Sequence, residues 1–268
     1  MKKTLLCGML LSLCSLTAHA DPAMEQALNN PLRSADNQAR DKYRHPGETL
    51  GFFDVQAGKT VIELWPGGGW YAEILAPLLA KDGHYVAANF DTQPAKDNPA
   101  PAYRTKIGLA FEAWLDEHRS ALGNASSLAF DPPFKSSLGN DNSADVVLTF
   151  RNLHNWAMQG QLETVFDSAY RVLKPGGVLG VVEHRAKPGM TMDSGYMDEA
   201  QMIAMAEKAG FTLAAKSEIN ANSKDSKDHP KGVWTLPPRL ALGDTDKEKY
   251  LAIGESDRMT LKFVKPGA

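Results

Sequence analysis

Apolar runs alternate with amphipathic stretches along most of this chain. Short apolar or alternating runs of the kind that form buried strands occupy 61–64, 84–90, 127–130, 144–150, 178–183, 211–217 and 258–264. Helical spacing of apolar residues and helix stop signals predict helices over 70–79, 107–122, 161–173 and 198–209. Strands that alternate with helices predict a parallel sheet covered on both faces. The expected fold class is therefore α/β.

Two polar segments interrupt this alternation. Residues 21–54 are helix-prone and form an N-terminal arm, with a short helix expected from Pro46. The arm is either a solvated amphipathic segment packed on the domain or a lid over a ligand. The main domain then covers 55–268, with an insertion at about 220–257. The length of that insertion favours a lid or a substrate-recognition loop, with a surface insertion as the alternative.

The first 20 residues have the features of a cleavable signal peptide. Lys2 and Lys3 precede an apolar core over 5–16, and Ala-His-Ala at 18–20 is typical of a cleavage site. The apolar core is shorter than the ~20 residues that span a bilayer. We therefore expect cleavage after Ala20 and export to the periplasm, with no membrane anchor left on the mature chain.

Cysteine content and charge exclude several classes of function. The two cysteines of the chain, Cys7 and Cys14, both lie in the predicted signal peptide. The mature chain then has no disulfide and no cysteine-ligated metal, so an apolar core must stabilise it. Loss of Lys2 and Lys3 changes the formal charge from −3 to −5. This balance does not suggest a nucleic-acid or anionic-membrane binder. The partner that we expect is a small-molecule substrate, and the sequence does not indicate an oligomeric state.

The first predicted strand ends in a glycine loop. Residues 61–71 read Val-Ile-Glu-Leu-Trp-Pro-Gly-Gly-Gly-Trp-Tyr, which predicts a strand, a tight turn and the start of a helix. Glycines let the backbone approach a ligand closely, and the free N–H groups of the following helix face the same place. The loop therefore predicts a site for a polar cofactor.

Four segments in a fixed order give the chain a family resemblance. They are Val-Ile-Glu-Leu-Trp-Pro-Gly-Gly-Gly (61–69), Asp-Val-Val-Leu-Thr-Phe-Arg-Asn-Leu-His (145–154), Arg-Val-Leu-Lys-Pro-Gly-Gly (171–177) and Lys-Ala-Gly-Phe (208–211). Over residues 55–219 and 258–264 the chain resembles the class I S-adenosylmethionine-dependent methyltransferases. It looks closest to a group of exported bacterial predicted methyltransferases that share the Glu-Leu-Trp-Pro-Gly-Gly-Gly loop. The resemblance implies a Rossmann-like, seven-stranded, mostly parallel sheet and S-adenosylmethionine as cofactor.

The resemblance also implies where the cofactor binds. The glycine loop would approach the methionine part of the cofactor, and Glu63 would offer a negative charge nearby. Trp65 stands where the family has its first loop glycine, which places an indole near the methionine end. Asp91 or Asn89 would bind the ribose hydroxyls. The residues expected at the cofactor are Glu63, Trp65, Gly67, Gly68, Gly69, Asn89, Asp91 and Asn152.

Some of these residues have simpler interpretations. Glu63 could pair with an arginine of the N-terminal arm, and Asp91 could initiate the turn that follows it. Asp131-Pro-Pro-Phe is similar to a motif that grips amines in amino-methyltransferases, but it precedes the fourth strand instead of following it. We therefore interpret it as a proline turn, with Asp131 a weak candidate for the adenine amine.

Candidate catalytic residues follow the fourth and fifth strands, at the sheet edge where open α/β sheets bind ligands. His154 or His184 could remove a proton from a hydroxyl or amine, since histidine titrates near neutral pH. Arg151 completes the expected catalytic set. The alternative is that these side chains only order the loops through hydrogen bonds. Asp225, Asp228 and His229 lack a diagnostic spacing for a metal, so no metal site is predicted.

The leading hypothesis for function is methyl transfer from S-adenosylmethionine to an unidentified small molecule. Two alternatives use the same fold: an exported protein that binds a small ligand without catalysis, and a different enzymatic activity in the same cleft. A fold alone does not decide among these three functions.

Overall fold

The computed structural model describes residues 21–96 and 100–267. Seven strands form one sheet in the order β3-β2-β1-β4-β5-β7-β6. Strands β3, β2, β1, β4 and β5 run parallel, whereas β7 is antiparallel to both β5 and β6. The strands are β1 Thr60–Leu64, β2 His84–Asn89, β3 Ser126–Ala129, β4 Ala144–Phe150, β5 Leu173–His184, β6 Thr212–Ser217 and β7 Arg258–Val264. The predicted α/β fold with a mostly parallel sheet is confirmed.

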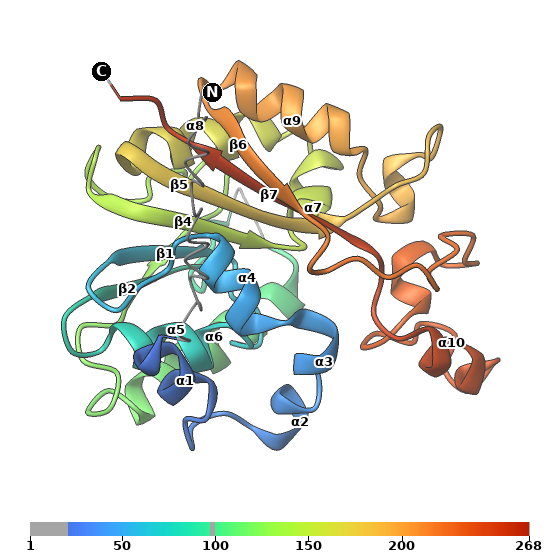
Figure 1. Ribbon diagram of the computed structural model, residues 1–268, viewed down its shortest axis with the longest axis horizontal. Helices are drawn as coiled ribbons and strands as arrows, with labels where there is room; N and C mark the ends of the chain where they lie inside the picture. The colour runs from blue at the N-terminus through green and yellow to red at the C-terminus, as the bar shows by residue number, and fades with distance from the viewer. Residues whose placement is uncertain (1–20, 97–99, 268) are drawn as a thin grey trace, which may run out of the picture.

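Helices cover both faces of this sheet (Figure 1). The arm supplies α1 Pro22–Leu28, α2 Ala35–Gln38, α3 Asp41–Arg44 and α4 Pro46–Phe52. The domain supplies α5 Ala72–Leu79, α6 Ala102–Glu117, α7 Leu153–Ala157, α8 Leu162–Val172 and α9 Glu199–Lys208. The insertion contains the short 3₁₀ helix η2 Gly232–Thr235 and α10 Lys247–Ile253, and the 3₁₀ helix η1 Met192–Ser194 precedes α9.

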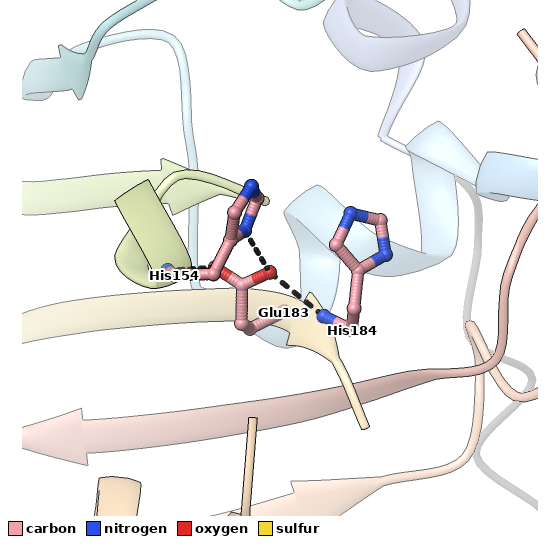
Figure 2. A group of neighbouring side chains, drawn as sticks. All are labelled: His154, Glu183 and His184. Atoms are coloured by element: carbon pink, nitrogen blue, oxygen red, sulfur yellow. Dashed lines mark hydrogen bonds and ion pairs between the residues drawn. The ribbon is translucent and has the colours of Figure 1, made fainter. Parts of the chain in front are cut away.

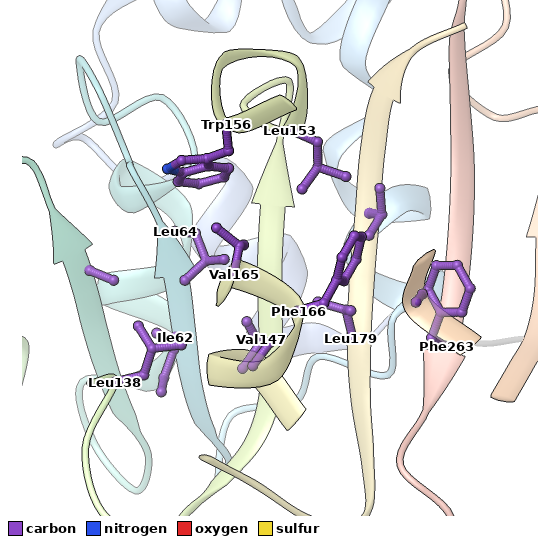
Figure 3. Close-up of a cluster of buried hydrophobic side chains, with 14 of the residues drawn as sticks. Ile62, Leu64, Leu138, Val147, Leu153, Trp156, Val165, Phe166, Leu179 and Phe263 are labelled. Carbon is purple, nitrogen blue, oxygen red and sulfur yellow. The ribbon is translucent and has the colours of Figure 1, made fainter. Parts of the chain in front are cut away.

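Alternate strand residues enter two separate hydrophobic cores. In β1, Val61 faces one core and Ile62 faces the other, as the two-residue period of a strand requires. Ile62, Leu64 and Val147 pack with Trp156 of α7 and Phe166 of α8 in the core shown in Figure 3. The second core contains apolar residues of α1, α4, α5 and α6. Both faces of the sheet are therefore covered, which confirms the prediction from the strand–helix alternation.

Gly180 of β5 shows how closely the arm packs on the sheet. A Cβ at this position would lie 2.6 Å from Cγ of Phe53, the residue that ends α4. Phe53 is fully buried. The glycine is thus required for the aromatic ring to reach the sheet.

The arm packs on the domain through α1 and α4, while most residues over 21–45 are exposed or half-buried, but two of its arginines are buried. Arg33 and Arg44 are 4% and 2% exposed, because their guanidinium groups pack against Trp70 and bind acidic partners inside the protein. The short helix predicted from Pro46 is confirmed as α4. The predicted signal peptide lies outside the described residues and stays a prediction, as do export and the boundaries drawn between arm, domain and insertion. No helix in the described part of the chain has the length and apolar character needed to cross a membrane.

One sheet edge collects chain segments that are far apart in sequence. The parallel strands β1, β4 and β5 end at this edge, and the antiparallel β7 begins there, because His184 pairs with Arg258 in the ladder between β5 and β7. The edge therefore receives the glycine loop, the residues after β4 and β5, and the residues before β7. This arrangement positions the candidate site.

Candidate active site

A cavity of about 390 Å³ opens at the carboxyl edge of the sheet, and we call it the edge cavity. The glycine loop and the segments that follow β4 and β5 form its floor. Side chains of the N-terminal arm and of residues 233–239 and 255–256 also line it. The arm and the insertion thus line the same cavity as the glycine loop, and a role of either as a lid stays a prediction. Of the predicted site residues, the edge cavity brings together Glu63, Trp65, Gly67, Gly68, Arg151, Asn152, His154 and His184.

The glycine loop leaves open space toward the edge cavity. A Cβ at Gly67 or Gly68 would have no heavy atom within 4 Å, so a ligand has room against this backbone. Gly67 also has φ +59°, a conformation that glycine adopts without strain. All three glycines also line a neighbouring cavity of about 220 Å³, where a Cβ at Gly69 would contact Phe111 of α6. Gly67 and Gly68 thus form a cradle for a ligand.

Trp65 adopts a left-handed backbone conformation, with φ +48°, at the position of the family's first loop glycine. Its indole is 4% exposed and packs against Phe90 and Trp156. Its Nε1 donates to the backbone oxygen of Phe130 at 2.7 Å. Arg104 of α6 covers the ring with its guanidinium carbon 4.5 Å from the ring centroid. The indole therefore anchors the loop to the core while one part of it lines the edge cavity.

Glu63 is buried at the end of β1 and accepts a hydrogen bond from the Tyr85 hydroxyl at 2.7 Å. The alternative role of Glu63 was an ion pair with an arginine of the arm, but its hydrogen-bond partner is Tyr85. Burial raises the pKa of the Glu63 carboxyl from 4.5 to about 7, while Tyr85 and the more distant Arg151 and Arg44 oppose that rise. Glu63 therefore presents a carboxyl group that titrates near neutral pH.

The two candidates for the ribose hydroxyls lie apart from the edge cavity. Asn89 is fully buried, and its side chain donates to the Gly108 oxygen and accepts from the Phe90 N–H. Asp91 is 5% exposed, accepts from the Gln93 N–H and pairs with Lys135 at 2.6 Å. Both side chains are occupied by protein partners. Asp91 also forms the turn considered as its alternative role, so ribose binding at either residue stays a prediction.

The Asp131-Pro-Pro-Phe segment forms the expected turn. Asp131 and Lys135 exchange backbone hydrogen bonds of 2.8 and 2.9 Å across it. Phe134 at its tip is 69% exposed. The segment therefore closes a surface turn next to β3, which agrees with the proline-turn interpretation.

His154 and Glu183 form a buried pair beside the edge cavity (Figure 2). Glu183 is fully buried near the end of β5. Its carboxylate accepts from His154 Nδ1 at 3.0 Å and from the backbone N–H groups of His154 and His184. Asn155 Nδ2 lies 3.1 Å from His154 Nε2 and donates to it when Nδ1 carries the proton. The carboxylate thus selects the tautomer whose Nε2 is unprotonated, and the Nε2 lone pair accepts from Asn155 in this structure.

His184 lies beside this pair, with its ring centroid 5.3 Å from that of His154. Its Nδ1 is 2.5 Å from the Ser256 hydroxyl. Burial, helped by the positive charge of nearby arginines, lowers the pKa of His184 well below its usual value. His184 is therefore neutral at physiological pH and is suited to hydrogen bonding rather than to carrying charge.

Arg151 and Asn152 connect β4 to the other elements of the site. The Arg151 backbone, at φ +61°, donates to the Val182 oxygen at 2.7 Å. The side-chain amide of Asn152 donates to the backbone oxygens of Leu64 and Trp65 at 3.0 and 3.1 Å. Asn152 thus holds the glycine loop against the end of β4, and its amide contacts protein backbone.

An arginine cluster around Glu255 was not predicted from the sequence. Glu255 lies just before β7, is 3% exposed, and pairs with four arginines: Arg40, Arg44, Arg151 and Arg258. These arginines lower the pKa of Glu255 to about 2 against the effect of burial. The sequence shows the arginines of the arm, but Glu255, the acid that pairs with them, lies 211 residues after Arg44.

Potential metal ligands also meet at this edge. His154, Glu183 and His184 place one ligand atom each within 4.8 Å of one another. The residues weighed in the insertion are arranged differently: Asp225 bonds His229 and Tyr196, whereas Asp228 pairs with Lys187. The insertion residues thus form a structural network. Among the described residues, His154, Glu183 and His184 are arranged so that they could bind a metal ion.

Comparison with known proteins fits this geometry. A family model described as a methyltransferase domain matches residues 115–181. The match covers about a quarter of the chain, and solved structures show the same fold over most of its length. A crystal structure of an S-adenosylmethionine-dependent methyltransferase from Aquifex aeolicus is 16% identical, with a TM-score of 0.55 over 91% of this chain and 98% of that one. No curated protein matches the chain in sequence.

Two further structures share the methyltransferase fold. The [4+2]-cyclase SpnF is 20% identical, with a TM-score of 0.57 over 89% of this chain and 85% of that one. An arsenic(III) S-adenosylmethionine methyltransferase from Chlamydomonas reinhardtii is 16% identical, with a TM-score of 0.51 over 92% and 74% of the two chains. At these identities the likeness shows the fold. The predicted fold is confirmed, and the methyltransferase-domain model over residues 115–181 agrees with the predicted family.

The methyltransferase cofactor fits one half of the site as it stands. The open backbone at Gly67 and Gly68 leaves room for the methionine part, and Glu63 lies at the same cavity to face its ammonium group. The nucleoside half differs from the expectation, because Asn89 and Asp91 are bound to other parts of the protein. Lys135 is partly exposed, so a ribose at Asp91 would have to displace this lysine.

Proposed function

We propose that this protein transfers a methyl group from S-adenosylmethionine to a small-molecule nucleophile. One observation supports this most strongly: His154, oriented by Glu183, lines the same cavity as the open glycine cradle. The base and the cofactor cradle lie at adjacent strand ends, β4 and β1. This is the arrangement that moving a methyl group onto a deprotonated acceptor requires.

His154 is proposed as the general base. Its Nδ1–H points to the Glu183 carboxylate, so Nε2 can take a proton from a hydroxyl or amine in the edge cavity. Glu183 then stabilises the imidazolium that forms, because its carboxylate is already 3.0 Å from Nδ1. Asn155 donates to Nε2 before the acceptor arrives and must turn away when it binds.

The remaining predicted residues bind the cofactor or the acceptor, or position the glycine loop. When bound, the cofactor supplies a methyl group activated by a sulfonium. Gly67 and Gly68 would hold its methionine backbone, and Glu63 would face its ammonium. Asn152 positions the loop through the Leu64 and Trp65 oxygens, so its expected part is indirect. His184, neutral and bonded to Ser256, would bind the acceptor rather than remove its proton.

A different reaction on the same fold is the second candidate. SpnF, which shares the fold, is named as a cyclase rather than a methyltransferase. In the present chain the candidate ribose ligands are engaged with Gly108 and Lys135, which favours a site that has changed its ligand. A binding protein without catalysis remains the third candidate, and the structure offers no feature that favours it over the second.

Calorimetry with S-adenosylmethionine and S-adenosylhomocysteine tests the proposal. The Gly68→Asp variant places a carboxylate in open space, so it should fold and abolish binding by filling the cradle and repelling the cofactor carboxylate. Gly58→Asp is the matched control, because Gly58 is exposed before the opposite end of β1 and also has open space. Folded wild-type protein that binds neither compound at millimolar concentration would rule out methyl transfer.

A further inference from the structure

The arginine cluster carries more positive charge than Glu255, the one carboxylate that it pairs with, can neutralise. Both oxygens of the Glu255 carboxylate are shared among Arg40, Arg44, Arg151 and Arg258, at 2.8 to 3.4 Å. Four guanidinium groups pair with this one carboxylate, and Glu63, which also acts on Arg44 and Arg151, resists ionisation because it is buried. Like charges at this spacing repel strongly where water is excluded. The cluster is therefore incomplete as an ion-pair network.

Three of these arginines have a buried N–H group without a hydrogen-bond partner among the described residues, and Nε of Arg258 is one of these groups. Nη1 of Arg44 and Nη2 of Arg40 are the other two. The Arg44 side chain is 2% exposed and is held against the indole of Trp70 at 4.5 Å. Both residues line the edge cavity. Buried donors without partners are costly, so their presence at a cavity points to a ligand that accepts from them.

The position of the cluster identifies which ligand this is. Glu255 leads into β7, which is three places from β1 in the sheet order, whereas the glycine cradle follows β1. Arg151 follows β4, and Ser256, next to Glu255, is bonded to His184. The cluster therefore reaches the two histidines through Arg151 and Ser256, while Arg44 packs on Trp70 beside the glycine loop. An anion held at Arg151 would lie next to the proposed base.

We propose that the acceptor carries an anionic group, a carboxylate or a phosphate, which is bound by Arg40, Arg44 and Arg151. The identification of the bound anion as part of the methyl acceptor rests on the proposed methyl transfer. The anion site itself rests on the cluster. Guanidinium groups bind carboxylates and phosphates through paired N–H donors, which is the chemistry that the unpartnered nitrogens offer. Burial together with the neighbouring arginines lowers the pKa of Arg44 and Arg40, the direction that a bound anion would reverse.

Two other occupants are less consistent with the geometry. The carboxylate of the cofactor would lie at the glycine cradle, which has its own backbone donors. A divalent metal on His154, Glu183 and His184 would add positive charge beside the arginines. Glu183 already accepts from three N–H groups, which a metal would displace.

Calorimetric titration of the purified protein with inorganic phosphate and with acetate tests the site. We expect binding at millimolar concentration or tighter, and Arg40→Gln should weaken it by roughly 10- to 100-fold through loss of a charged hydrogen bond. Arg33→Gln is the control, since Arg33 is another arginine of the arm that pairs with an acid, Asp41, but does not line the edge cavity; its side chain is more buried than that of Arg40. Binding that is unchanged in Arg40→Gln would overturn the proposal.

A second measurement separates a ligand site from a purely structural network. Without added anion, Arg40→Gln should unfold at the same or a higher temperature than wild type. The substitution removes one of the four guanidinium groups that repel one another around Glu255. A large fall in its unfolding temperature would mean that the arginines serve the fold, and would overturn the proposal. This comparison remains informative when a more deeply buried variant such as Arg44→Gln fails to fold.

The titrations are repeated with saturating S-adenosylhomocysteine and with a chelator. Additive binding supports an acceptor site. Competition with S-adenosylhomocysteine would assign the arginines to the cofactor carboxylate, and loss of phosphate binding with the chelator would assign the anion to a bound metal; either result overturns the proposal. Failure of S-adenosylhomocysteine to bind, with phosphate binding that still depends on Arg40, would reject methyl transfer and support the anion site.

Discussion

The Glu63→Gln substitution should stabilise the protein at alkaline pH and leave its stability unchanged at acidic pH. Burial raises the pKa of Glu63 from 4.5 to about 7 in the folded state. The folded protein therefore holds this proton more tightly than the unfolded chain does, so the Glu63 contribution to stability falls as pH rises from 4.5 to 7. Glutamine does not titrate and still offers an oxygen to the Tyr85 hydroxyl.

The size of the effect follows from that difference in pKa. Each pKa unit corresponds to about 1.4 kcal/mol, so the shift from 4.5 to about 7 makes the ionised carboxylate cost about 3 kcal/mol above pH 7. The free energy of unfolding of Glu63→Gln should exceed that of wild type by about this amount at pH 8. The excess should decline steadily below pH 7 and vanish near pH 4.5.

Urea unfolding of both proteins between pH 4.5 and 8.5 measures this difference. Glu207→Gln, an exposed glutamate of α9, is the control and should change stability by less than about 0.5 kcal/mol at every pH. A difference that does not vary with pH, or a glutamine variant that is less stable at pH 8, would refute the assignment of a buried carboxyl that resists ionisation.

Four further predictions follow from the same contacts. The affinity for S-adenosylmethionine should rise with pH below 7, by up to roughly tenfold per pH unit, because a cation beside Glu63 favours its carboxylate; Glu63→Gln should remove this slope in calorimetry. Glu183→Gln should lower the rate of methyl transfer by roughly 100-fold or more while cofactor binding is unchanged, and an equal rate would exclude the His154 base. Gly180→Ala should destabilise the fold by about 1–3 kcal/mol in urea unfolding through collision with Phe53, whereas Gly58→Ala should not. A reporter enzyme fused after residue 25 should be exported, and retention in the cytoplasm would reject the signal peptide.

Much of the sheet could be predicted because strands buried on both faces consist of continuous apolar runs. The predicted strands over 144–150 and 258–264 match β4 and β7 to the residue. The first helix turn of α6 was missed: it begins at Ala102 rather than at Ile107, since Arg104 is polar in sequence but packs on the Trp65 ring. Tertiary contact therefore overrides the local pattern at that helix.

The candidate site was predicted in part for similar reasons. His154, His184 and the glycine loop follow strands that end at one sheet edge, so topology alone brings them together. Glu183 stood beside His184 in the sequence, but its role depends on the side-chain direction set by β5. The arginine cluster could not be predicted, because arginine is usually exposed and Arg40 lies 215 residues from Glu255.

Transfer of a labelled methyl group tests the central claim most directly. Purified protein is incubated with methyl-labelled S-adenosylmethionine and the small-molecule fraction of cells, and labelled products are separated by charge. Methyl transfer through the His154–Glu183 pair predicts a labelled anionic product with wild type and its loss with His154→Ala. Cofactor binding without any label transfer, or equal transfer by wild type and His154→Ala, would contradict the proposed function.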